Sequence, residues 1–202
     1  MKKILNIVSS AKGKHSFSIK LSDAIIDKLL TAYPGSHVKT HDLTANPMPH
    51  LQERQLEAFF TPEDLRTPDH KDAVSYSDQA IQDLKEADII VIGVPLYNFS
   101  IPSALKAWID HVVRRGITFS YGDDGPKGLI TNKKVYLAVA SGGIYSDGPM
   151  KSYDFAEPFV RFILNFIGLN DITTFRVEGT NVPQLKDAAF PKAIESVNEF
   201  AF

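Results

Sequence analysis

Short apolar stretches alternate along this chain with segments in which apolar residues recur every three or four positions. Five of the stretches, rich in Ile, Val and Leu, are typical of strands buried in a sheet. They are Lys3–Val8, His37–Leu43, Asp88–Val94, Lys134–Ala140 and Ile172–Val177. The helical periodicity follows Ser18 as far as Pro34, spans Tyr76–Ala87, begins at Ser103 and again at Glu157, and spans Asp187–Phe200. This alternation predicts an α/β fold, with a doubly wound, mainly parallel five-stranded sheet.

The change of period after the third predicted strand marks a candidate binding loop. Asp88–Val94 has the pattern of a strand, whereas Leu105, Trp108 and Ile109 are spaced as on one face of a helix. In open α/β sheets, ligands bind at the carboxyl ends of the strands. We therefore expect the loop between them to present an aromatic wall, an amide and backbone N–H groups to a flat heteroaromatic ring. Its candidate residues are Pro95, Leu96, Tyr97, Asn98 and Phe99.

The loop after the first predicted strand has the composition of a phosphate site. Ser10, Ser16 and Ser18 precede a predicted helix, whose first N–H groups have no partner inside the helix. Hydroxyls and a helix N-terminus together suit a phosphomonoester. Serines at these positions also serve as ordinary helix caps, and the segment alone leaves both interpretations open.

A third candidate loop, Ala140–Gly143, follows the fourth predicted strand. Gly142 and Gly143 permit a close approach of the backbone to a ligand, although two glycines also suit a plain turn. In a sheet of order 2-1-3-4-5, the first, third and fourth strands lie side by side, so their loops converge. A ligand with a phosphate at one end and a redox-active ring at the other, as in FMN, fits the three loops together.

The composition narrows the partners that we expect. The 202 residues and 44% hydrophobic content suit one domain spanning residues 1–202. A formal charge of -2 without long basic runs argues against nucleic acid. Since the chain has no cysteine, thiolate chemistry is excluded, and redox work would need an organic cofactor. The first apolar run is too short for a signal peptide or a membrane span, so we expect a cytoplasmic protein.

Two long connections and one apolar helix suggest a cover or a second subunit. Thr44–Ser75 contains a helical patch at Leu51–Phe60, and connections of this length usually have a function. The segment after Gly116 carries Phe119 and Tyr121 before a turn, and we expect it to form a flap beside the site. The helix from Glu157 is apolar nearly all round, which predicts deep burial or a subunit contact.

Taken together, the motifs resemble the FMN-dependent NADH-azoreductase family of flavodoxin-like quinone and azo reductases. The resemblance covers nearly the whole chain in the right order, and the combination of motifs is specific although no single motif is. The motifs are Ser10, Ser16, Phe17 and Ser18; Pro95–Pro102; Leu105–Asp110; Thr118–Tyr121 before Gly125-Pro126; Gly142–Tyr145; and Phe166–Gly168.

The resemblance implies a flavodoxin-like fold and a homodimer with two FMN sites, each completed by the partner chain. It places the phosphate at Ser10, Ser16 and Ser18, and the ring along Leu96–Phe99 and Ala140–Gly143. It implies two-electron ping-pong transfer, in which the flavin takes a hydride from NADH or NADPH and then reduces azo compounds or quinones. Ser141 stands where many relatives carry Arg, which puts a charged contact there in doubt. Tyr121 and Tyr145 are candidates for stacking or proton donation, and edge packing explains them equally well.

Other classes fit less well. A hydrolase lacks its nucleophile motif, because Ile144 occupies the glycine position before Tyr145-Ser146-Asp147-Gly148. No metal site is expected, since the six histidines show no paired ligand spacing. Within flavin chemistry, the alternative is a flavodoxin-type FMN electron carrier that acts on protein partners, although the strong acidity typical of carriers is absent. A flavin-free interaction protein with the same fold is the third possibility. The sequence leaves open the physiological acceptor and the choice between NADH and NADPH.

Overall fold

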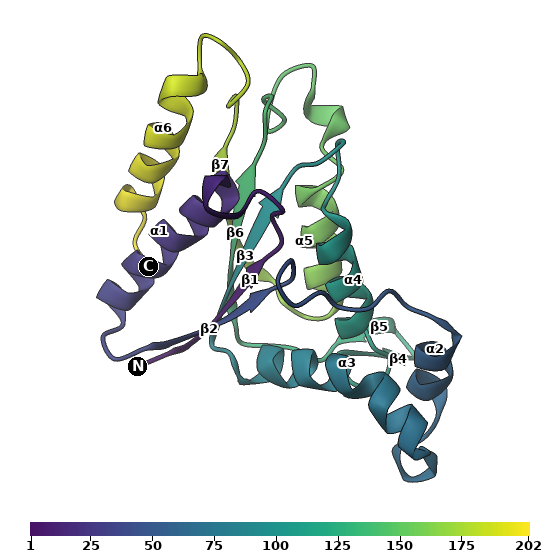
Figure 1. Cartoon of the computed structure of the whole chain (residues 1–202). Helices are drawn as coiled ribbons and strands as arrows, with labels where there is room; N and C mark the ends of the chain where they lie inside the picture. Colours follow the sequence, from purple (N-terminus) through teal and green to yellow (C-terminus); the bar gives the residue numbers. More distant parts are fainter.

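The computed structural model describes residues 1–202 and contains a five-stranded parallel sheet (Figure 1). Its strands are β1 (Lys3–Val8), β2 (His37–Asp42), β3 (Ile89–Pro95), β6 (Lys134–Ala140) and β7 (Asp171–Val177). Their order is β2-β1-β3-β6-β7. The predicted parallel sheet is confirmed, but the order differs from 2-1-3-4-5 when every strand is counted. The difference arises because the predicted flap forms two further strands, β4 (Phe119–Gly122) and β5 (Gly125–Gly128), in a separate antiparallel hairpin.

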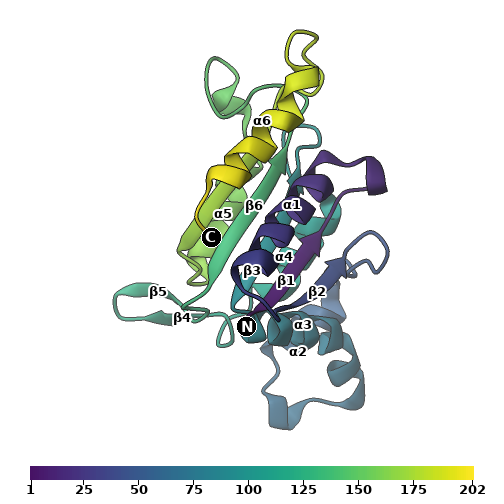
Figure 2. The same cartoon turned by 90° about the vertical axis from the view of Figure 1, so that its left-hand side faces the viewer.

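Helices cover both faces of the sheet (Figures 1 and 2). In β3, Ile90 and Ile92 face one core, while Ile89 and Val91 face the other. This burial on both sides is the reason for the unbroken apolar run of the central strand. One face is covered by α1 (Phe17–Ala32) and α6 (Lys186–Glu199), the other by α3 (Pro68–Glu86), α4 (Ser103–Val112) and α5 (Glu157–Phe166).

The start of α3 corrects a predicted boundary. We expected the helix to begin at Tyr76, but it begins at Pro68. The Thr67 side chain accepts a hydrogen bond from the His70 N–H at 3.2 Å, and Pro68 occupies the first turn, where proline is favoured. These local signals extend the helix beyond its apolar face. Short helical segments complete the chain: η1 (Gly13–His15), α2 (Glu53–Phe60), η2 (Glu63–Leu65) and η3 (Lys151–Tyr153).

The excursion that contains α2 is attached to α3 and α4 through buried polar groups. The Arg114 guanidinium lies over the Phe59 ring at 4.5 Å, and His111 Nε2 is 2.9 Å from the Pro49 carbonyl oxygen. Both His111 and Arg114 are buried. Burial lowers the pKa of His111, and the nearby Arg114 charge lowers it further. Phe59 is therefore part of this anchor, whereas Phe60 remains exposed.

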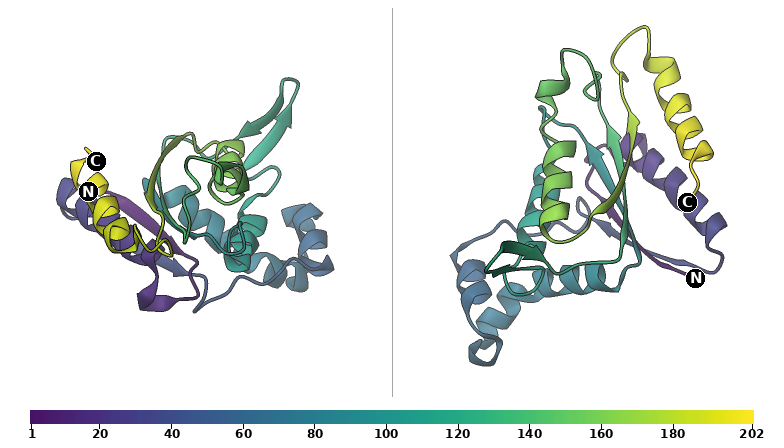
Figure 3. Two further views of the ribbon diagram at one scale, coloured as in Figure 1. Left: turned by 90° about the horizontal axis from the view of Figure 1, so that it is seen from above. Right: turned by 180° about the vertical axis from the view of Figure 1, so that it is seen from behind.

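The hairpin and the candidate loops lie at opposite ends of the sheet. After β5, the Ile130 N–H donates to the Ile167 carbonyl at 2.9 Å, at the end of α5 that leads into β7. The hairpin also contacts this turn closely, since a Cβ on Gly128 would lie 2.2 Å from the Gly168 nitrogen. The loops after β1, β3 and β6 are at the other end (Figures 1 and 3). The prediction that this segment forms a flap beside the site of its own chain is therefore wrong.

None of the helices combines the length and the apolar character that a bilayer crossing requires.

Candidate functional site

Buried hydroxyls line the loop between β1 and α1. Ser16 is the N-cap of α1, and its hydroxyl oxygen lies 3.0 Å from that of Ser18. The Ser9 hydroxyl donates to the Gly93 carbonyl at 2.8 Å, which fixes the start of the loop on the neighbouring strand. Ser10, Ser16 and Ser18 are all at least 98% buried. Ser16 and Ser18 thus place two hydroxyls in the first turn of α1, where backbone N–H groups have no partner within the helix.

The loop after β3 contains a strained turn. Tyr97 and Ser100 exchange two backbone hydrogen bonds of 2.9 and 3.0 Å, and the two residues between them have positive φ. Asn98 has φ 48° and Phe99 has φ 69°. Asn tolerates this left-handed region, whereas a bulky residue there costs about 1–3 kcal/mol. The turn exposes both side chains, and the Phe99 carbonyl accepts the Phe155 N–H at 3.1 Å.

Direct hydrogen bonds join the three loops. The Ser10 and Tyr97 hydroxyl oxygens are 3.0 Å apart, which connects the first loop to the second. The Leu96 N–H donates to the Ala140 carbonyl at 2.8 Å, which connects the second loop to the third. The predicted convergence of the loops is therefore observed.

A fourth segment, Glu178–Asn181, runs along the third loop after β7. Gly179 donates to the Gly143 carbonyl at 3.0 Å, and Asn181 donates to the Gly142 carbonyl at 2.9 Å. A Cβ on Gly142 would lie 2.6 Å from Asn181 Nδ2, so only glycine fits without a displacement of that side chain. This segment was missed in the sequence because its residues carry no motif. The only available signal was the predicted sheet order, which puts the fifth strand beside the fourth and therefore the loop after it beside the third loop.

A cavity of about 160 Å³ lies between these loops. It collects hydroxyls and an ammonium group near the α1 start, and backbone and amide groups near the third loop. Lys12, Thr180 and Asn181 are lining residues that the sequence analysis missed. The full lining is Ser10, Lys12, Ser16, Phe17, Pro95, Leu96, Tyr97, Ala140, Ser141, Gly142, Thr180 and Asn181.

The remaining predicted residues lie around this cavity or far from it. Ser18 is buried behind Ser16, while Asn98, Phe99 and Gly143 continue the lining loops. The Tyr145 ring packs edge-on against the Phe99 ring, with centroids 6.2 Å apart. Tyr121, in contrast, is exposed on the hairpin at the other end of the sheet and is not brought to the loops of its own chain.

A larger hollow of about 640 Å³ lies at the amino ends of the strands, but it has a different chemistry. Its lining includes Lys2, Lys134, Asp88 and Asp171, which are surface charges of both signs. Its lining includes neither the N-terminus of a helix nor a set of buried hydroxyls. The carboxyl-end cavity is therefore the better candidate site, in agreement with the usual position of ligands in such sheets.

Donors of the cleft suit a ligand with two unlike ends. The Ser10 and Ser16 hydroxyls, the α1 N-terminus and Lys12 match a phosphate, and the buried Ser18 hydroxyl lies 3.0 Å from that of Ser16. The other end has no charged lining group and consists of Leu96, Tyr97 and the glycine-containing loop, which suits a flat ring.

Comparison with known proteins gives concordant matches. The sequence profile of a family described as having a flavodoxin-like fold matches residues 2–201. An FMN-dependent NADH:quinone oxidoreductase from Herminiimonas arsenicoxydans is 46% identical over 200 residues, covering 98% of each chain. An azoreductase from Bacillus anthracis str. Sterne superposes with a TM-score of 0.88 at 31% identity, covering 99% of this chain and 100% of the other.

An FMN-dependent NADH-azoreductase from Bacillus anthracis str. Ames Ancestor, solved in complex with FMN, superposes with a TM-score of 0.83. It is 25% identical, and the match covers 100% of both chains. The family resemblance predicted from the motifs is thereby confirmed. This chain belongs to the flavodoxin-like family that contains the FMN-dependent NADH:quinone oxidoreductases and azoreductases.

Proposed function

We propose that this protein is an FMN-dependent NADH oxidoreductase that reduces quinones and azo compounds. The names of its relatives support this function over nearly the full length of the chain. The structural observation that carries the proposal is the convergence of three loops, with hydroxyl donors at one end and a strained aromatic turn at the other.

The residues of the cleft fit FMN. In the proposed arrangement, Ser10, Ser16 and Ser18 bind the phosphate, together with the N–H groups of Phe17 and Ser18 at the helix start. Pro95–Phe99 and Ala140–Gly143 flank the ring, and the Asn98 amide binds its polar edge. Gly142 has a role in this arrangement because a Cβ at this position would lie 2.6 Å from Asn181 Nδ2, so the glycine allows Asn181 to pack against the third loop where both residues line the cleft. Bound FMN would accept a hydride from NADH and deliver two electrons to the acceptor.

The chain itself contributes position and electrostatics. No carboxylate or histidine lines the cleft, and the ionisable side chains among its lining residues are Lys12 and Tyr97. In the proposed arrangement, the N–H groups of Asn98, Phe99 and Gly143 would stabilise negative charge at the ring edge. The Tyr145 ring packs edge-on against the Phe99 ring and so supports the side of the turn after β3.

A homodimer forms part of the proposal. Phe162 on α5 is 64% exposed and Tyr121 on the hairpin is 60% exposed, which leaves aromatic surface uncovered in one chain. Tyr121 lies at the end of the sheet opposite to the cleft of its own chain. In a homodimer in which a second copy covers α5, Tyr121 would therefore contribute only to the cleft of the partner chain. Residues 1–202 act as one unit in this proposal, and the protein is placed in the cytoplasm, where NADH is available.

Anaerobic spectroscopy tests the function. The purified protein, loaded with FMN, should lose its flavin absorbance near-stoichiometrically on addition of NADH and regain it when a quinone or an azo dye is added. NADPH serves as the comparison nucleotide, and mass measurement in solution reports the dimer. Failure of NADH to reduce the bound flavin would overturn the proposed reaction. Reoxidation by one-electron protein acceptors but not by quinones or azo dyes would indicate the electron-carrier alternative.

A further inference from the structure

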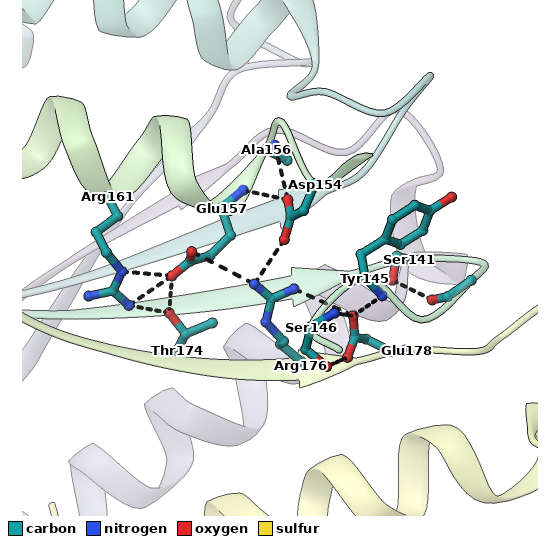
Figure 4. Close-up of polar contacts among 11 residues, drawn as sticks. Ser141, Tyr145, Ser146, Asp154, Ala156, Glu157, Arg161, Thr174, Arg176 and Glu178 are labelled. Carbon is teal, nitrogen blue, oxygen red and sulfur yellow. Dashed lines mark hydrogen bonds and ion pairs between the residues drawn. The ribbon is translucent and has the colours of Figure 1, made fainter. Parts of the chain in front are cut away.

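An ion network lies beside the segment that follows the third loop (Figure 4). It connects β7, the start of α5 and the loop itself through two guanidinium groups and three carboxylates. Its ionic members are Asp154, Glu157, Arg161, Arg176 and Glu178. None of these residues lines the cavity.

Glu178 binds the backbone of Tyr145 and Ser146, in the segment that follows the third loop. Its Oε1 accepts the N–H groups of Tyr145 at 2.8 Å and Ser146 at 2.9 Å, and its Oε2 accepts the Ser146 hydroxyl. The Glu178 side chain is only 13% exposed. A carboxylate that is largely removed from water needs hydrogen bonds and a counter-charge.

Arg176 supplies that counter-charge and joins it to α5. Its Nη1 is 3.4 Å from Glu178 Oε1, and its Nη2 is 3.0 Å from Asp154 Oδ2. Asp154 in turn accepts the N–H groups of Ala156 and Glu157, both at 3.1 Å, at the start of α5. The Ser141 hydroxyl donates to the Gly143 carbonyl at 2.8 Å, and the cation paired with Glu178 is Arg176.

This arrangement determines where the loop meets the cleft. With the Tyr145 backbone fixed by Glu178, the Tyr145 ring lies against Phe99 and within 3.1 Å of a Cβ position on Gly143. Gly143 also accepts from Gly179, the residue after Glu178. The strained turn at Phe99 and the glycine loop are therefore positioned relative to each other through Tyr145 and Glu178, which do not line the cavity.

We propose that Arg176 and Glu178 are positioning residues that fix the third loop in the shape that receives the ring end of the cofactor. The proposal rests on the proposed function for the identity of that cofactor. It predicts a specific separation of effects, because a loop displaced at the ring end weakens FMN and riboflavin alike, whereas loss of a phosphate contact weakens FMN alone.

Three variants and a matched control test it. Arg176→Met keeps the aliphatic stem without the charge, Arg176→Lys restores a cation, and Glu178→Gln keeps one acceptor oxygen. Arg161→Met is the control, since Arg161 belongs to the same network but bonds Glu157, Thr174 and the Ile172 carbonyl without reaching Glu178. The probes are FMN and riboflavin titrated into apoprotein by fluorescence, and hydrogen exchange of residues 141–146 and 179 in the apoprotein.

We expect Arg176→Met and Glu178→Gln to raise both dissociation constants about tenfold and to speed exchange within this segment. Arg176→Lys should recover most of the affinity. Arg161→Met should keep both dissociation constants within about twofold of the wild type, even if it lowers the melting temperature as much as Arg176→Met does. Unchanged affinity and exchange in Arg176→Met and Glu178→Gln, or equal losses in Arg161→Met, would overturn the proposal. If the wild type binds neither flavin, the proposed function fails, and the exchange rates alone decide whether Arg176 fixes the loop.

Discussion

The two ends of the cleft are built in different ways. At the phosphate end, Ser16 is the N-cap of α1 and also lines the cavity, so the same hydroxyl stabilises the fold and is available to a ligand. At the ring end, Asn98 and Phe99 occupy left-handed conformations that a stable fold does not require. The phosphate end is therefore expected to be formed without a ligand. The ring end stores strain, and its shape depends on contacts with β6, β7 and the start of α5.

The largest expected effect separates phosphate binding from helix capping. In Ser16→Asp, the side chain still caps α1, because Asp is as good an N-cap as Ser. The added carboxylate would face the phosphate. Two like charges about 4 Å apart repel by about 4 kcal/mol at an effective dielectric constant of about 20. FMN affinity should fall by more than about a hundredfold. Riboflavin affinity should change little, as measured by fluorescence titration of the apoprotein.

Ser16→Asn is the matched control, since it keeps the cap without the charge. It should retain most of the FMN affinity and the melting temperature of the wild type. An equal loss of riboflavin binding in Ser16→Asp would mean that the loop had rearranged, and would remove the distinction between the two ends.

At the ring end, Asn98→Gly tests whether the turn serves binding rather than folding. Glycine relieves the left-handed strain but loses more entropy on folding, so the stability should change by less than about 1 kcal/mol. Loss of the amide removes hydrogen bonds worth about 0.5–1.5 kcal/mol each, which predicts up to about tenfold weaker binding of both FMN and riboflavin. Titration of both flavins, with urea denaturation, measures the two quantities.

Asn98→Ala provides the opposite case, because alanine keeps the strain and loses the amide. It should be less stable than Asn98→Gly while binding flavin no better. A variant Asn98→Gly with wild-type affinity for both flavins would show that the amide makes no contact with the ring.

Sequence reasoning succeeded where the determinants are local. The buried strands follow from runs such as Ile89–Val94, and the hydroxyl of Ser16 follows from its place before a helix, although the helix begins at Phe17 and therefore includes Ser18. It failed where residues distant in the chain decide the geometry. Nothing near Glu178 in the sequence indicates that its carboxylate binds the backbone of Tyr145, and nothing near Tyr121 indicates that its hairpin turns away from the site.

A smaller effect concerns His111, which anchors the α2 excursion away from both ends of the cleft. Its Nε2 donates to the Pro49 carbonyl, and its Nδ1 is buried without a partner. Burial and the Arg114 charge lower the folded-state pKa below the unfolded value of about 6.5. The unfolded chain therefore binds the extra proton first, so this stability is full above about pH 6.5 and is lost as pH falls toward the folded pKa.

Urea denaturation of the wild type and His111→Gln between about pH 5 and 8 measures this contribution, since Gln donates to Pro49 without titrating. The variant should show the flatter pH dependence. Riboflavin affinity should be the same in both proteins across the range, because the excursion contacts neither end of the cleft. Parallel pH profiles for the two proteins would exclude His111 as the source.

The smallest expected effect refines the account of the phosphate end. Lys12 lines the cavity but is exposed, unlike the three serines, so water and salt screen its charge. Lys12→Gln should therefore weaken FMN binding only about threefold at low salt, which corresponds to less than about 1 kcal/mol, and should leave riboflavin unchanged. The difference should vanish at about 1 M salt, where the Debye length is about 3 Å. A loss that persists at high salt would mean that Lys12 contacts the phosphate directly in a desolvated geometry, and that the phosphate end depends on charge as well as on buried hydroxyls.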